Sequence, residues 1–117
     1  MSPDKTFEKV RKLCLSYPDA SEKKSWGHPN FLAGKKTFVT FERWKGRPSI
    51  AFLVENAESA KIRPGGEFFL TPYGRGKWIS LWIDKPVPQW RVIKELVEAS
   101  YRLVSRPKKS GLVSSRI

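Results

Sequence analysis

The sequence is poor in the residues that build metal sites and covalent catalytic sites. Its 117 residues include one histidine, His28, and one cysteine, Cys14. A lone cysteine forms no intrachain disulfide, and one histidine with one cysteine is too few for a zinc site of the usual Cys/His kind. No serine lies in a G-x-S-x-G context, and the glycines around Arg75 match no phosphate-binding loop. We therefore expect no metal, no cofactor and no catalytic residues. An enzyme would need a pocket that joins His28 to a carboxylate.

Long apolar runs are also missing. No stretch approaches about 20 consecutive apolar residues, and Met1–Asp4 does not begin a hydrophobic signal segment. The free cysteine is typical of a reducing compartment. These features predict a cytoplasmic protein that does not enter a membrane.

Acidic residues are few: 11 Asp and Glu face 23 Lys and Arg, a formal charge of +12. Such an excess attracts polyanions such as nucleic acids, although basic surfaces also serve solubility alone. Apolar residues make up 39% of the chain and aromatic residues 13%. That content is sufficient for a folded domain and excludes a disordered chain.

Hydrophobic periodicity predicts an α+β domain. Ser2 and Pro3 are typical of a helix start, and apolar residues then recur at helical spacing until Pro18. A second long helix is predicted over 90–104, and a short one over 57–62. Strands are expected over 26–31, 38–41, 50–54, 68–70 and 78–83, the first three joined by tight hairpins. We predict one two-layer domain over residues 1–106, a mostly antiparallel five-stranded sheet with the N- and C-terminal helices on one face, and a flexible basic tail over 107–117.

Alternation along the 78–83 strand separates two kinds of side chain. Ile79, Leu81 and Ile83 face one side, which we place under the helices, and Trp78 and Trp82 face the other. Trp26 and His28 are two residues apart and so share one side of their strand. If that side is also the side of the other two tryptophans, the four residues form a ligand or stacking face: Trp26, His28, Trp78 and Trp82. His28 itself is expected to be structural rather than catalytic.

Cations gather on the predicted turns. Projecting lysines and arginines contact phosphates, and neighbouring tryptophans stack on unpaired bases. The predicted nucleic-acid contacts are Lys35, Lys36, Arg43, Lys45, Arg47, Arg75 and Lys77. The alternative is that the cations at these tips are simply solvated.

An ordered set of motifs resembles the MmcQ/YjbR family of small bacterial proteins. The motifs are Leu15-Ser16-Tyr17-Pro18, Trp26-Gly27-His28-Pro29, Gly34-Lys35-Lys36-Thr37-Phe38, Tyr73-Gly74-Arg75-Gly76-Lys77-Trp78 and Ser100-Tyr101-Arg102-Leu103-Val104. The resemblance implies a CyaY-like fold, described for this family as a double-wing DNA-binding fold, with wings at Lys35–Lys36 and Arg43–Arg47. Frataxins, which are similar in fold, bind iron through an acidic helix, whereas the N-terminal helix here carries more cations than anions, so we expect no iron site.

Two hypotheses follow from these patterns. The first is a non-enzymatic DNA-binding module, with RNA as an alternative polyanion. The second is a protein- or small-ligand-interaction domain that uses the Trp/His-rich face. The chain is expected to be a monomer or a weak homodimer.

Overall fold

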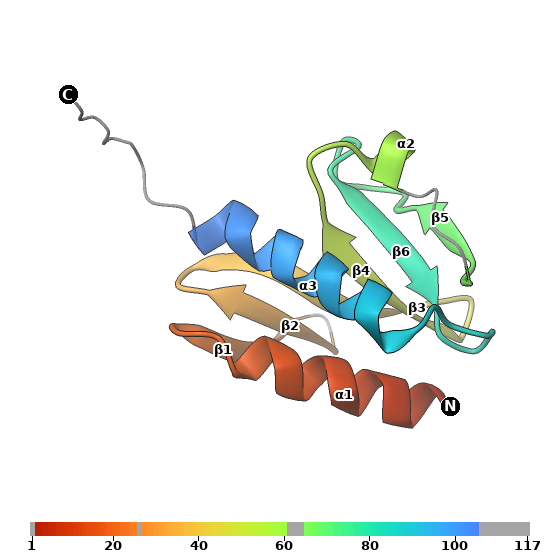
Figure 1. Ribbon diagram of the computed structural model, residues 1–117, viewed down its shortest axis with the longest axis horizontal. Helices are drawn as coiled ribbons and strands as arrows, with labels where there is room; N and C mark the ends of the chain where they lie inside the picture. The colour runs from red at the N-terminus through yellow and green to blue at the C-terminus, as the bar shows by residue number, and fades with distance from the viewer. Residues whose placement is uncertain (1, 26, 61–64, 106–117) are drawn as a thin grey trace.

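The computed structural model describes residues 2–25, 27–60 and 65–105. These ranges contain three helices and six strands, drawn in Figure 1. In chain order they are α1 (Pro3–Leu15), β1 (Ala20–Ser25), β2 (His28–Ala33), β3 (Lys36–Trp44), β4 (Arg47–Leu53), α2 (Ala57–Ala60), β5 (Phe68–Leu70), β6 (Trp78–Trp82) and α3 (Trp90–Ser105). The predicted tail over 107–117 lies outside the described residues.

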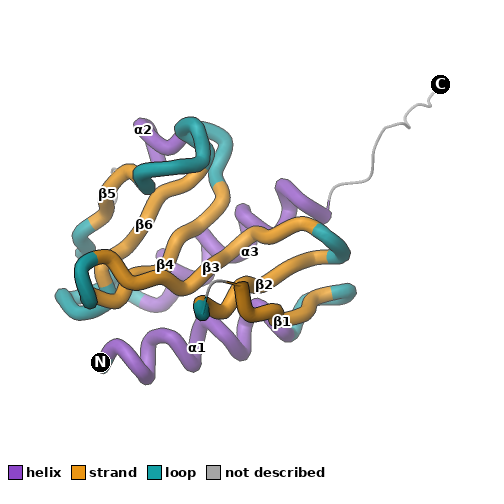
Figure 2. Tube along the Cα trace, turned by 180° about the vertical axis from the view of Figure 1, so that it is seen from behind, coloured by secondary structure: helices purple, strands orange, loops and turns teal. Residues whose placement is uncertain are grey.

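The strands form one antiparallel sheet in the order β1-β2-β3-β4-β6-β5. Figure 2 shows the sheet from the side opposite α1 and α3, which both lie behind the strands. The predicted α+β architecture, with N- and C-terminal helices on one face, is therefore confirmed. Within the described ranges, no helix is long and apolar enough to cross a membrane.

The strand count was predicted wrongly, because β1 was missed. Its sequence, Ala-Ser-Glu-Lys-Lys-Ser, has no apolar alternation. β1 is an edge strand that pairs only with β2. Backbone hydrogen bonds to β2, rather than burial of apolar side chains, hold it in the sheet. Glu22 is held from the helical side by Arg11 of α1, whose Nε lies 2.7 Å from Oε1. Lysines on an edge strand also hinder pairing with another sheet.

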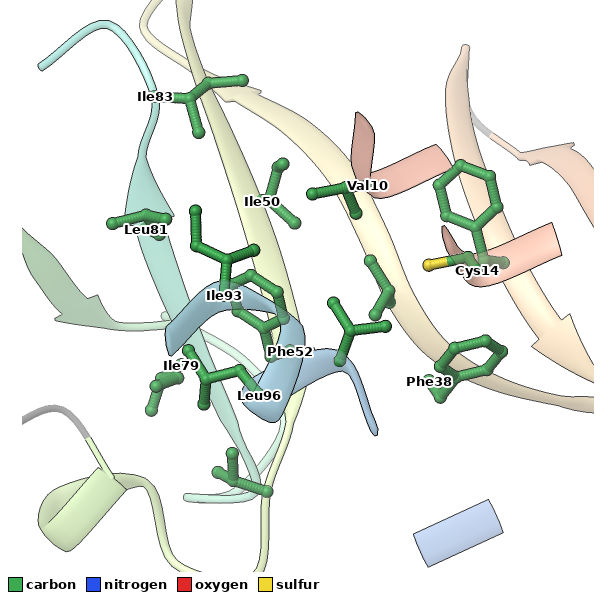
Figure 3. Packing of buried hydrophobic residues seen from close by; sticks show 14 of the residues in the cluster. Val10, Cys14, Phe38, Ile50, Phe52, Ile79, Leu81, Ile83, Ile93 and Leu96 are labelled. Carbon is green, nitrogen blue, oxygen red and sulfur yellow. The ribbon is translucent and has the colours of Figure 1, made fainter. Parts of the chain in front are cut away.

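The core lies between the helices and the sheet. Ile79, Leu81 and Ile83 are buried against Ile93 and Leu96 of α3, as Figure 3 shows. The predicted alternation of this strand is confirmed, since its aliphatic side faces the helices. On α1, Val10 and Cys14 are fully buried in the same cluster. Ser2 caps α1 as predicted, because its hydroxyl accepts a hydrogen bond from the backbone N–H of Lys5 at 3.2 Å.

The predicted hairpins are also confirmed. Two residues, Lys45 and Gly46, join β3 to β4, with Trp44 paired to Arg47. Their φ angles are 53° and 80°, the positive values that a tight hairpin matching the twist of its strands requires. This turn projects one lysine beyond the end of the sheet.

Candidate functional site

The sheet face opposite α1 and α3, here called the open face, is partly covered by the chain itself. Ser49 and Ala51 of β4 and Ser80 of β6 point to this face, yet all three are fully buried. The loop over 71–77, between β5 and β6, provides cover. Thr71 joins it to the sheet through a 2.7 Å hydrogen bond between its hydroxyl and that of Ser80. Figure 2 shows this loop in front of the strands at the end near α2.

Tyr73 connects the loop to β3, which lies two strands away from β6 in the sheet. Its hydroxyl donates a hydrogen bond to Oε2 of Glu42 on β3, although β4 separates β3 from β6. Its ring also lies 6.1 Å from the ring of Trp44, two residues further along β3. One exposed side chain thus covers both a carboxylate and an indole.

Glu42 is a half-buried carboxyl group on the open face. Burial raises its pKa to about 7, because removing water disfavours the charged form. Oε1 of Glu42 and Nε1 of Trp44 are both buried without a hydrogen-bond partner among the described residues. The β2–β3 register pairs Asn30 with Thr40, so His28 lies on the same face, at the position next to Glu42 on the neighbouring strand. No hydrogen bond or ion pair joins the imidazole to a described residue.

Four aromatic side chains gather at the β3–β4 hairpin end of this face. Besides the Trp44–Tyr73 pair, Phe69 of β5 stacks on Trp82 of β6 with ring centroids 4.3 Å apart. Between the two pairs is a hollow of about 350 Å³, here called the aromatic hollow, lined by Trp44, Lys45, Arg47, Phe69, Pro72 and Trp82. Apolar walls with cations at the rim suit a planar, anionic ligand.

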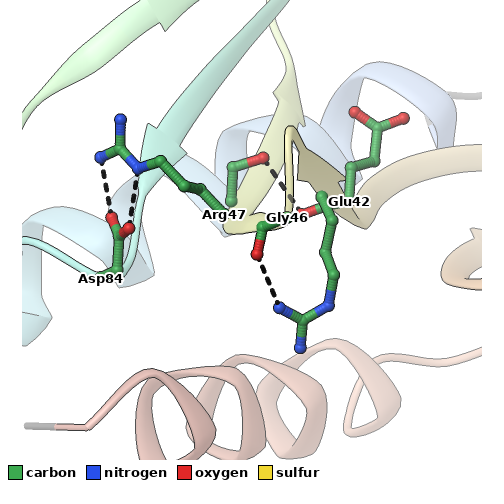
Figure 4. A network of polar contacts seen from close by, with 6 residues as sticks. Glu42, Gly46, Arg47 and Asp84 are labelled. Atoms are coloured by element: carbon green, nitrogen blue, oxygen red, sulfur yellow. Dashed lines mark hydrogen bonds and ion pairs between the residues drawn. The ribbon is translucent and has the colours of Figure 1, made fainter.

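Arg47 belongs to the wall of the aromatic hollow. Its guanidinium lies 3.8 Å from the ring centroid of Trp82 and binds Asp84 through two hydrogen bonds of 2.8 and 3.0 Å (Figure 4). The hydrogen bond from Arg47 lowers the pKa of Asp84, so this carboxyl group stays negatively charged. The two opposite charges cancel, and the pair adds no net charge to the wall. β4 and β5 flank β6, so Arg47 and Phe69 approach Trp82 from opposite sides. Trp82 is thus held in place, and Trp44 is the tryptophan available to a ligand.

The seven predicted cations occupy three separate places. Arg43, Lys45 and Arg47 lie at the β3–β4 hairpin, where Nη1 of Arg43 donates to the carbonyl of Gly46 at 3.3 Å. Lys35 and Lys36 lie at the β2–β3 hairpin, at the other end of the nine-residue β3, about 26 Å away at 3.3 Å per residue. Arg75 and Lys77 are exposed on the 71–77 loop, and Nζ of Lys77 donates to the carbonyl of Glu55. The two predicted wings therefore point away from each other.

The predicted Trp/His face does not form one surface. His28, on β2, lies three strand spacings from Trp82, on β6, or about 14 Å. Trp78 lies four residues along β6 from Trp82, about 13 Å, and packs against Gly74, whose added Cβ would sit 2.3 Å from its Cδ1. Trp26 lies outside the described residues. The structure groups Trp82 with Trp44, Phe69 and Tyr73 instead.

Sequence reasoning missed Glu42, Trp44, Phe69 and Tyr73 as site residues. Alternation from Glu42 to Trp44 could have placed both on one face of β3. The path of the 71–77 loop across β4 leaves no local signal. Within the described ranges, no group of three or more His, Cys, Asp and Glu residues could hold a metal ion.

Comparison with known proteins assigns this arrangement to a family. The model of the YjbR family matches residues 15–103. The chain belongs to the YjbR family. A crystal structure of a protein from Pseudomonas syringae is similar to it, with a TM-score of 0.65 and 16% sequence identity, over 84% of this chain and 97% of that one. At this identity the likeness shows a shared fold only. No curated protein matches the chain.

Proposed function

We propose that this YjbR-family protein is a non-enzymatic nucleic-acid-binding module that contacts its ligand at the β3–β4 hairpin end of the open face. The observation that carries the proposal is the aromatic hollow, lined by Trp44, Phe69 and Trp82 with Lys45 at its rim. Base rings stack on aromatic side chains whatever their sequence, and nearby cations hold the phosphates. The formal charge of +12 strengthens attraction to any polyanion.

The geometry favours unpaired nucleotides over an intact duplex. A base reaches the aromatic hollow only if it leaves its stack, as the bases of single strands do. The predicted double-wing contact with a duplex needs the β2–β3 hairpin as well, at the far end of β3, about 26 Å from Trp44. We therefore expect single-stranded DNA or RNA to bind more tightly than the corresponding duplex.

The experiment is a fluorescence anisotropy titration of labelled single-stranded and duplex DNA and RNA at several salt concentrations. Lys45→Glu is the test variant, because Lys45 lines the aromatic hollow, whereas Arg43 points to the helical side of β3, over the ring of Phe41. Lys94→Glu is the control, because it makes the same change in net charge on the helical layer, where this lysine is exposed. A third variant, Lys35→Glu with Lys36→Glu, tests the other hairpin.

Wild-type affinity is expected to fall steeply with salt. At about 0.7 per phosphate for single strands, the test variant should flatten the log–log slope by about 0.7, because one contact is lost. Equal losses in the test and control variants would show that net charge alone attracts the ligand. Absence of binding at low salt would overturn the proposal.

A second function is favoured by the Arg47–Asp84 pair. This pair neutralises one rim cation, which leaves the aromatic hollow more apolar than a phosphate site needs. An apolar side chain of a partner protein, or a small apolar ligand, would fit such walls. Binding that is insensitive to salt but lost in Trp44→Ala would support this second function.

A further inference from the structure

Two buried polar atoms on the open face have no partner among the described residues: Oε1 of Glu42 and Nε1 of Trp44. Buried polar groups are nearly always hydrogen-bonded in folded proteins, so each exception asks for an explanation. The other two such atoms belong to Thr6, in α1, and Tyr17, which follows it. Only the pair on β3 lies beside the aromatic hollow.

Glu42 and Trp44 are two residues apart on one strand, so both point to the same face, with their Cα atoms about 6.6 Å apart. Tyr73 contacts both, through its hydroxyl on Glu42 and its ring beside Trp44. This tyrosine is 44% exposed and lies on a loop with positive φ angles at three successive residues, Gly74, Arg75 and Gly76. Movement of this one side chain would uncover an acceptor and a donor together.

We propose that Glu42 and Trp44 recognise a guanine base. This inference rests on the proposed nucleic-acid function. The Watson–Crick edge of guanine carries two adjacent donors, N1–H and the N2 amino group, next to the acceptor O6. A carboxylate accepts both donors at once, and an indole N–H is a donor only. In the other bases no two neighbouring positions of this edge both donate.

Each polar atom of the guanine edge can be paired with one atom of Glu42 or Trp44. N1–H donates to Oε1 of Glu42, the N2 amino group replaces the Tyr73 hydroxyl on Oε2, and Nε1 of Trp44 donates to O6. The ring then enters the aromatic hollow, which Trp44 lines together with Phe69 and Pro72. The attached phosphates lie toward Lys45, the exposed cation at the rim of the hollow.

The test uses labelled heptathymidylate whose central base is guanine, hypoxanthine, adenine or thymine. Hypoxanthine lacks only the N2 amino group, so it isolates one of the three hydrogen bonds. The titrations are run at pH 8, above the pKa of about 7 that burial gives Glu42. For the wild type we expect guanine to bind about tenfold more tightly than hypoxanthine, the usual size of such base discrimination.

Three conservative variants separate recognition from folding. Glu42→Gln replaces one of the two acceptor oxygens with an amide donor, so it cannot pair with N1–H and the N2 amino group side by side and should abolish the guanine preference. Trp44→Phe keeps a ring but removes the N–H, so it should lower guanine affinity while leaving the preference over hypoxanthine. Tyr73→Phe removes the competing hydroxyl and should raise guanine affinity several-fold, a gain that a purely structural role for Tyr73 does not predict. Melting temperatures confirm that each variant is folded.

The outcomes separate this inference from the proposed function. Equal wild-type affinity for guanine, hypoxanthine, adenine and thymine would overturn guanine recognition and leave nucleic-acid binding intact. A guanine preference that survives in Glu42→Gln would place recognition elsewhere and overturn it too. Absence of binding to every oligonucleotide would overturn both.

Discussion

Replacing Glu42 with glutamine should increase the free energy of unfolding, and this increase should be larger at alkaline pH than at acidic pH. Burial raises the pKa of this carboxyl from 4.5 to about 7, so the folded chain holds the proton more tightly than the unfolded chain. Below pH 4.5 the group is neutral in both states. Between pH 4.5 and 7 the unfolded chain ionises first and stability falls, and above pH 7 the loss is complete.

The magnitude follows from the same two values. At about 1.4 kcal/mol per pH unit, the gap sets a ceiling of about 3 kcal/mol. Glu42 is only half-buried, and solvent that reaches it reduces this ceiling. We therefore expect the free energy of unfolding of Glu42→Gln, relative to wild type, to increase by about 1–2 kcal/mol between pH 5 and pH 8. Glutamine still accepts the hydrogen bond from Tyr73.

Urea denaturation of both proteins at pH 5 and pH 8 measures this difference. The groups beside Glu42 are His28 on β2, Ser49 on β4 and Tyr73 on the loop. Glu55→Gln, at an exposed carboxyl, is the matched control. A difference between Glu42→Gln and wild type that is the same at both pH values would refute the reasoning.

Three further predictions concern the loop and the core. Gly74→Ala should lower the free energy of unfolding by about 1–3 kcal/mol, because φ is 91° and an added Cβ would lie 2.3 Å from Cδ1 of Trp78; a thermal melt that equals wild type would contradict this. Leu96→Ala should cost about 2–5 kcal/mol in urea denaturation, since the side chain is 2% exposed in the core; a cost below about 1 kcal/mol would indicate that it packs loosely. The Cys14 thiol should resist alkylation until the protein unfolds, because complete burial raises its pKa; rapid modification of the folded protein would disprove its burial.

The helices and hairpins were predictable because their signals are local. Ser2 and Pro3 mark the start of α1, and Gly46 marks the turn between β3 and β4. β1 had no such signal, since a polar edge strand is specified by pairing with β2 rather than by a buried face.

The candidate site was predicted only in part. Lys45 and Arg47 were identified from their hairpin, and Trp82 from the alternation of its strand. The contact between Tyr73 and Glu42 joins residues 31 positions apart, and it depends on the strand order and on the path of the 71–77 loop. Both are tertiary properties that no local pattern encodes.

The central claim is that a base enters the aromatic hollow beside Trp44. The most direct measurement is a ¹H–¹⁵N spectrum of the indole N–H signals during titration with the guanine-containing oligonucleotide, with the Trp44 signal assigned from Trp44→Phe. We predict that this signal moves on binding, while that of Trp90, on the helical layer, does not. Saturable binding with an unmoved Trp44 signal would contradict the account.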